Sequence, residues 1–163
     1  MRAAVRAACL LLAASACSAA DRKEFVSGEY HLRFSVPVSW DQPIDEGPDR
    51  GIAGPDGYVK LTALGGPKTV AEACRVESQH RMQPYGPNPR VDMLSISGRP
   101  GCRIIPTVAD AQGQKIPAGL ILQFRRPLQL EPRRIHARPY PYLVVWTDPN
   151  HLPMVEETLR LEP

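Results

Sequence analysis

The chain has 163 residues, a length typical of one domain of ordinary size. Its 20 basic and 17 acidic side chains leave a formal net charge of +3, which indicates neither a nucleic-acid-binding protein nor an acidic substrate. The sequence contains no internal repeat and no composition shift that would mark a second domain. We therefore expect a single folded unit that follows a targeting segment.

Residues 1–20 have the parts of a secretory signal peptide. Arg2 and Arg6 give it a positive start, residues 7–14 form an apolar run, and small residues continue to Ala20. The apolar run is too short for a permanent membrane span, so we predict export and removal of the segment. Without Arg2 and Arg6 the basic count falls from 20 to 18 against 17 acids, which leaves a mature net charge of +1.

Two cleavage sites compete within this segment. One lies after Ala20, and the other lies before Cys17. Residues 12–17, LAASAC, resemble the lipobox of bacterial lipoproteins, although Ala14 stands where that family usually has leucine. In such proteins the cysteine after the cut is acylated and anchors the mature chain. The resemblance therefore implies lipidation of Cys17 and a membrane-anchored protein, with a soluble periplasmic protein as the alternative.

The remaining cysteines favour the same interpretation. Cys9 leaves with the signal peptide, and Cys74 and Cys102 can pair in the oxidising compartment that export implies. Cys17 is then an odd thiol that acylation would explain. The spacing of Cys74 and His80 could begin a metal site, but zinc needs four ligands and no second pair appears, so we predict a disulfide and no metal or other cofactor.

The first half of the chain predicts few elements. Residues 21–28 are expected to be a polar tether, and residues 29–163 a single domain. Residues 30–36 alternate between apolar and polar side chains, as in a half-buried antiparallel strand that Pro37 ends, with Trp40 at the edge of the core. Residues 41–57 are rich in Pro, Gly and Asp and predict a long loop.

The acidic residues of this loop could bind a cation. Asp45, Glu46 and Asp49 lie close together in it, but they lack the ligand spacing of an EF-hand. We therefore expect a solvated acidic loop. The histidines are interpreted in the same way, as isolated surface or capping residues: His31, His136 and His151.

A helix is predicted to begin at Thr69, because Thr69 and Glu72 have the spacing of a capping box. Pro84 should end it near Gln83. A second helix should begin near residues 148–150. Strands are expected on either side of the first helix, at 58–64, 91–97, 103–108, 118–124 and 140–146.

This element order predicts an α+β fold, an antiparallel sheet packed against helices. The opening EYHLRFSVPVSW and the closing VEETLRL resemble the PsbP-like fold, which implies a PsbP-like α/β sandwich. The stretch CRVESQHRMQPYG with the later GCRIIP resembles a signature of small exported bacterial proteins of unknown function. The resemblance implies a binding or assembly module with no known catalysis.

A basic stretch suggests one partner. Residues 125–138 carry five arginines against Glu131 alone, and two tyrosines follow. The arginines that we predict to contact an anionic envelope partner are Arg125, Arg126, Arg133, Arg134 and Arg138. The alternative is an exposed hairpin loop in which the arginines only solubilise the protein.

We therefore expect an exported, lipid-anchored binding or assembly module of the cell envelope, in contact with a membrane and not with nucleic acid. The alternatives are a small envelope hydrolase and an extracytoplasmic ligand sensor. The hydrolase lacks an evident nucleophile–base pair in the sequence.

Overall fold

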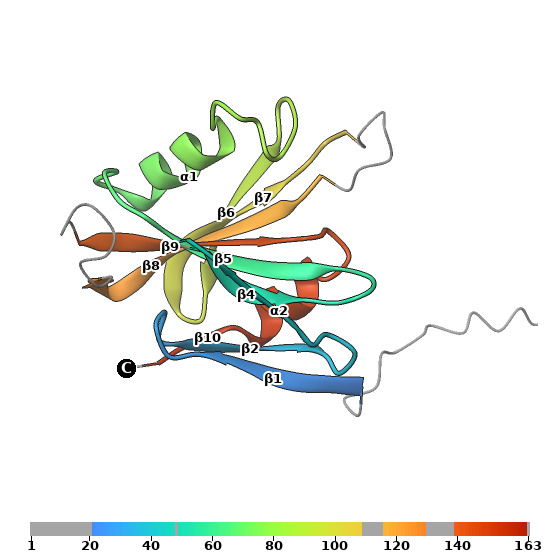
Figure 1. The fold of residues 1–163 in the computed structure, drawn as a ribbon. Helices are drawn as coiled ribbons and strands as arrows, with labels where there is room; N and C mark the ends of the chain where they lie inside the picture. Colours follow the sequence, from blue (N-terminus) through green and yellow to red (C-terminus); the bar gives the residue numbers. More distant parts are fainter. Residues whose placement is uncertain (1–20, 48, 109–115, 130–138, 163) are drawn as a thin grey trace, which may run out of the picture.

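The computed structural model describes residues 21–47, 49–108, 116–129 and 139–162. Two antiparallel sheets and two short helices make up the fold (Figure 1). Of the described residues, 51% lie in strands and 14% in helices. No helix in the described ranges is long and apolar enough to cross a membrane.

The larger sheet has seven strands, and every neighbouring pair is antiparallel. In spatial order its strands are β3 (Gln42–Glu46), β4 (Asp49–Ala53), β5 (Tyr58–Leu64), β9 (Tyr140–Thr147), β8 (Ala118–Leu128), β7 (Arg99–Ile105) and β6 (Arg90–Ile96). β3 and β6 are therefore the two edge strands of this sheet.

The smaller sheet has three strands in the order β1 (Arg22–Ser27), β2 (Leu32–Pro37) and β10 (Arg160–Leu161). It lies on one side of the seven-stranded sheet together with helix α2 (Leu152–Thr158), while helix α1 (Val70–Ser78) lies on the other side (Figure 1). The larger sheet is thus covered on both faces.

Two apolar cores follow from this arrangement, one on each face of the larger sheet. In β9, Leu143 and Val145 face the first core, which contains β2 and α2, whereas Tyr142 and Val144 face the second core beneath α1. All four side chains are at most 2% exposed. A strand buried on both faces carries a near-continuous apolar run, which explains the sequence of β9.

The predicted α+β sandwich of PsbP-like type is wrong, because the protein is a β-rich sandwich of two sheets. The difference comes from two polar segments. Residues 21–28, predicted as a tether, contain β1, which pairs along its length with β2. The predicted loop 41–57 contains the β3–β4 hairpin.

Both segments escaped prediction because they bury little apolar surface. Phe25 is the one side chain of β1 that packs against the first core. β3 is an edge strand, where Pro43 is tolerated. In β4, a Cβ on Gly51 would run into the carbonyl oxygen of Val59, so glycine permits the close approach of β5. Trp40, expected at the edge of the core, is fully buried.

The elements with strong local signals are confirmed. β5 has the predicted limits, and Thr69 caps α1, its Oγ1 accepting a hydrogen bond from the Glu72 backbone N–H at 3.1 Å. α1 is nevertheless shorter than predicted, because it ends at Ser78 and turns follow well before Pro84. Ser97 and Gly98 both have positive φ, 52° and 71°, which gives the β6–β7 hairpin a tight two-residue turn.

Candidate functional site

A concave surface lies between α1 and the edge strand β6. We call it the α1–β6 groove. Its volume is about 570 Å³, and it is lined by one side of α1, by the loop of residues 83–89, and by Val91 and Met93 of β6. Val91 and Met93 are two residues apart, so they share one face of the strand, the face that α1 overlies.

Apolar side chains are left in solvent around this groove. Seven large apolar side chains are exposed in the described part of the chain, and four of them lie on α1, the loop after it and β6. These four are Val76, Met82, Val91 and Met93. Met93 is 56% exposed and Met82 is 80% exposed. Of these four, Val91 and Met93 belong to the lining of the groove, whereas Val76 and Met82 do not. Exposed apolar side chains that line a groove are typical of an interaction site.

The groove carries one charged side chain along its lining, Arg75 of α1, whose guanidinium donates a hydrogen bond to Gln79 Oε1 at 3.3 Å. No carboxylate belongs to the described lining. The nearby Glu72 instead accepts a hydrogen bond from the Lys68 backbone N–H at 2.8 Å, as in a helix cap. The described lining of the groove is therefore weakly cationic.

The Cys74–Cys102 disulfide joins α1 to β7 beside the groove. The Cα atoms lie 6.2 Å apart, and both residues are at most 1% exposed. This confirms the predicted pair, and it uses Cys74 in a disulfide rather than beside His80. Cys74 of α1 lines the groove, and Cys102 pairs with Met93 of β6. The disulfide therefore fixes the position of α1 relative to β6.

Buried hydrogen bonds among Tyr85, Glu77 and Trp146 hold the loop of residues 83–89, which lines the groove. Tyr85 is fully buried, and its hydroxyl donates to Glu77 Oε1 at 3.0 Å. Trp146 Nε1 lies 3.0 Å from the same oxygen and 2.6 Å from the Tyr85 hydroxyl. Burial, and then the Glu77 carboxylate, raise the pKa of Tyr85 well above its usual value. Stability that depends on the neutral phenol is thus present below a pH of about 10 and lost above it, because the unfolded phenol ionises first.

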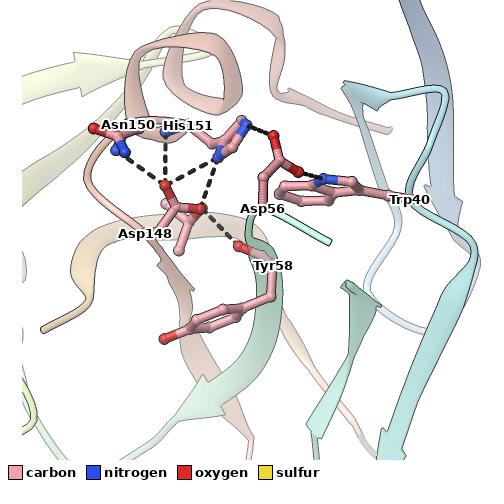
Figure 2. Close-up of polar contacts among 7 residues, drawn as sticks. Trp40, Asp56, Tyr58, Asp148, Asn150 and His151 are labelled. Carbon is pink, nitrogen blue, oxygen red and sulfur yellow. Dashed lines mark hydrogen bonds and ion pairs between the residues drawn. The ribbon is translucent and has the colours of Figure 1, made fainter. Parts of the chain in front are cut away.

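A second polar cluster lies at the start of α2, on the other side of the larger sheet (Figure 2). His151 Nδ1 lies 2.9 Å and 2.8 Å from the two carboxylate oxygens of Asp148, and its Nε2 lies 3.5 Å from Asp56. Asp56 also accepts a hydrogen bond from Trp40 Nε1 at 2.7 Å. Figure 2 shows Asp56 between the Trp40 and His151 side chains.

Local sequence explains how this cluster forms. Asp148 accepts hydrogen bonds from the backbone N–H groups of Asn150 at 3.1 Å and His151 at 3.2 Å, so it holds the turn that leads into α2. The N-cap of α2 is His151, one residue after the predicted positions 148–150, and its side chain makes no cap hydrogen bond. Gly57, in the predicted turn, lies against the same group: a Cβ there would come within 2.8 Å of His151 Nδ1. Burial, and then Asp148, raise the pKa of Tyr58.

This cluster resembles a catalytic dyad only in part. A histidine whose Nδ1 faces a buried carboxylate is also found in Ser–His–Asp triads, but there the Nε2 faces the nucleophile. Here Nε2 faces the Asp56 carboxylate, and the His151 side chain is only 16% exposed. His151 therefore connects α2 to Asp56 in the β4–β5 turn, and Asp56 in turn bonds Trp40. The cluster thus has a structural role.

Replacing Asp148 with alanine should lower the free energy of unfolding by about 2–4 kcal/mol. The substitution removes two hydrogen bonds from the turn before α2 and leaves His151 with one carboxylate fewer in a largely buried position. Asp41→Ala, at an exposed position between β2 and β3, is the control and should change stability by about 0.5 kcal/mol or less. Urea denaturation measures both variants; equal losses would contradict the assigned role of Asp148.

The other predicted site residues are distributed as follows. Arg125 and Arg126 are exposed in β8, where its pairing with β9 shifts register between Gln123 and Leu128. They therefore belong to a strand and not to a hairpin loop. The remaining members of the predicted arginine group, Arg133, Arg134 and Arg138, lie outside the described residues, as do His136 and Cys17.

Two predictions about polar residues are corrected. His151 is the N-cap residue of α2, in agreement with the predicted capping role, but it is not isolated, because its carboxylate partners lie at positions 56 and 148. The acidic segment is the β3–β4 hairpin and not a loop: the 76% exposed Asp45 lies 2.6 Å from Arg50, and Asp49 Oδ2 lies 3.1 Å from Lys60. The groove itself was missed, although Val91 and Met93 on one face of β6 and Leu94 and Ile96 on the other signal a strand with two apolar faces.

Comparisons with known proteins add little to this description. No protein-family model matches the chain, and no curated protein is significantly similar to it. A crystal structure from Bacteroides thetaiotaomicron VPI-5482, solved at 1.50 Å resolution, is similar with 13% sequence identity and a TM-score of 0.48. The match covers 88% of this chain and 49% of that one, so this chain spans about half the length of that protein. The resemblance to PsbP-like proteins stays a prediction.

Proposed function

We propose that this protein is an exported, lipid-anchored module of the cell envelope that binds a partner in the α1–β6 groove. The observation that carries the proposal is the groove with its exposed apolar side chains, above all Met93. Its volume of about 570 Å³ falls in the range of about 300–1,000 Å³ that is usual for binding sites. Methionine side chains adapt their shape to a ligand, which suits a binding surface.

The proposed anchor is the acyl group on Cys17, which the lipobox-like sequence supports. Because β1 begins at Arg22, only residues 18–21 would separate the anchor from the fold. Four extended residues span at most about 14 Å. α1 lies on the opposite side of the larger sheet from β1 (Figure 1), so the groove would face the compartment and not the membrane.

The hydrolase alternative gains no support from the most enzyme-like cluster, because both ring nitrogens of His151 face carboxylates. The ligand-sensor alternative shares the groove with our proposal and differs only in the size of the occupant. The exposed Arg125 and Arg126 are compatible with a second, anionic contact in the envelope.

Two matched substitutions test the groove. Met93→Asp places a charge in it, whereas Val26→Asp makes the same kind of change on the other sheet, and the two native side chains are 56% and 55% exposed. After chemical cross-linking of envelopes, the partner should co-purify with wild type and with Val26→Asp, and at least tenfold less with Met93→Asp. Co-purification that is equal for both variants would contradict a binding role of the groove.

The anchor is tested in the same cells. Cys17→Ala should move the protein from the membrane fraction to the soluble fraction, because lipidation contributes about 0.8 kcal/mol for each methylene that is buried in the membrane. Intact-mass measurement of wild type should show an acylated chain that begins at Cys17. A mature chain that begins at Asp21 would contradict the anchor and leave the groove proposal to be judged by the co-purification result.

A further inference from the structure

We infer that the occupant of the α1–β6 groove is an extended segment of a partner protein, which pairs with the free edge of β6 as an additional strand and places a carboxylate against Arg75. This inference rests on the proposed function and specifies its partner. Three features carry it: the unpaired edge of β6, the period of the side chains that line the groove, and the charge of the lining.

The edge of β6 offers backbone hydrogen-bonding groups. Within the described residues β6 pairs only with β7, from Arg90 opposite Ile105 to Ile96 opposite Arg99. The other edge of its seven residues is therefore a template for a further strand, which is the basis of peptide binding by strand addition. The exposed Arg90–Asp92 ion pair, 3.1 Å apart, occupies only the first part of this edge. Residues 93–96 carry no charge.

The side chains of β6 match the period of such a ligand. Val91 and Met93 point to the groove, and the intervening Asp92 points to the other face, where Arg103 lies 3.2 Å from it and bridges to Glu156 of α2. A strand added beside β6 would place every second side chain in the groove, against Met93 and α1. Apolar residues at alternate positions are thus expected in the ligand.

The charge of the groove selects the kind of occupant. Arg75 is the single charged residue of the described lining, and no carboxylate balances it there. A second copy of this chain paired through the same edge would bring like surfaces together, so that Arg75 would face an equally basic surface. A membrane lipid is disfavoured because α1 lies on the opposite side of the larger sheet from β1, the strand that would follow the proposed anchor (Figure 1). An acidic, apolar peptide segment fits all three features.

Peptide selection tests the inference. A random 12-residue peptide library is panned against purified Cys17→Ala protein, and we expect binders with apolar residues at alternate positions and an Asp or Glu beside them. Arg75→Glu should weaken these peptides at least tenfold, and replacement of the peptide carboxylate by lysine should restore binding to that variant. Arg81→Glu, which makes the same charge change outside the groove, should alter affinity less than twofold.

Amide hydrogen exchange of the complex identifies the binding mode. Strand addition should increase protection in β6, and N-methylation of alternate peptide amides should abolish binding. Helical binders, binders that respond equally to Arg75→Glu and Arg81→Glu, no enriched peptides, or a dimer of the free protein that is lost in Arg75→Glu would each overturn the inference. If Met93→Asp still removes the envelope partner, such a result overturns only the strand-addition model and leaves the proposed function standing.

Discussion

Loss of the Cys74–Cys102 disulfide is expected to lower the free energy of unfolding by about 3.5 kcal/mol. The bridge spans a sequence separation of 28 residues, and this value follows from the loss of loop-closure entropy in the unfolded chain. Cys74→Ala alone should destabilise the protein nearly as much as the double substitution Cys74→Ala, Cys102→Ala. Urea denaturation with and without a phosphine reductant measures the effect.

The double variant is also the control for this experiment, since its stability should not respond to the reductant. Three buried residues, Ala73, Cys74 and Glu77, fix the nine-residue α1 to the sheet, so the bridge is a large part of its attachment. Wild-type protein whose stability does not change on reduction would show that α1 is held without the bridge.

Gly119→Ala is expected to lower the free energy of unfolding by about 2–4 kcal/mol. A Cβ on Gly119 would lie 2.6 Å from the Tyr85 hydroxyl and 2.8 Å from its ring Cε1. Tyr85 cannot move aside cheaply, because it is fully buried and hydrogen-bonded to Glu77 and Trp146. The substitution therefore causes overpacking and breaks buried hydrogen bonds.

Gly28→Ala is the matched control, because a Cβ there would meet nothing within 4 Å and the backbone has no positive φ. Its stability should stay within about 0.5 kcal/mol of wild type. Combining Gly119→Ala with Tyr85→Ala should cost clearly less than the sum of the single losses, since both act on the same contact. Equal losses for the two glycine variants would contradict the packing of Tyr85 on β8.

Local signals predicted those parts of the fold in which burial and sequence period agree. β5 and β9 were predicted nearly to the residue, because their apolar side chains fill one or both cores. The disulfide was predicted because only Cys74 and Cys102 remained to pair in an exported chain. β1 and the β3–β4 hairpin were not predicted, because they join the sheets mainly through backbone pairing. Such pairing does not require apolar side chains at alternate positions of the sequence.

The sites depended on distant residues and were harder to predict. Asp56 approaches His151 only after β5 and β9 pair, so no local spacing marks this contact, whereas Asp148 lies three residues before His151. The groove likewise exists because α1 overlies the β6 edge, although the strand pattern of Val91 and Met93 was visible. The arginine group, by contrast, is conspicuous in the sequence. Its described members, Arg125 and Arg126, lie in strand β8.

The central claim is that a partner binds in the α1–β6 groove, and site-specific photo-cross-linking in intact cells tests it most directly. A photoreactive amino acid is placed at position 93 in the groove, or at position 26 on β1, two sites whose native side chains are 56% and 55% exposed. We expect a discrete cross-linked protein from position 93 and none from position 26. The same cross-linked products from both positions, or none from position 93, would contradict it.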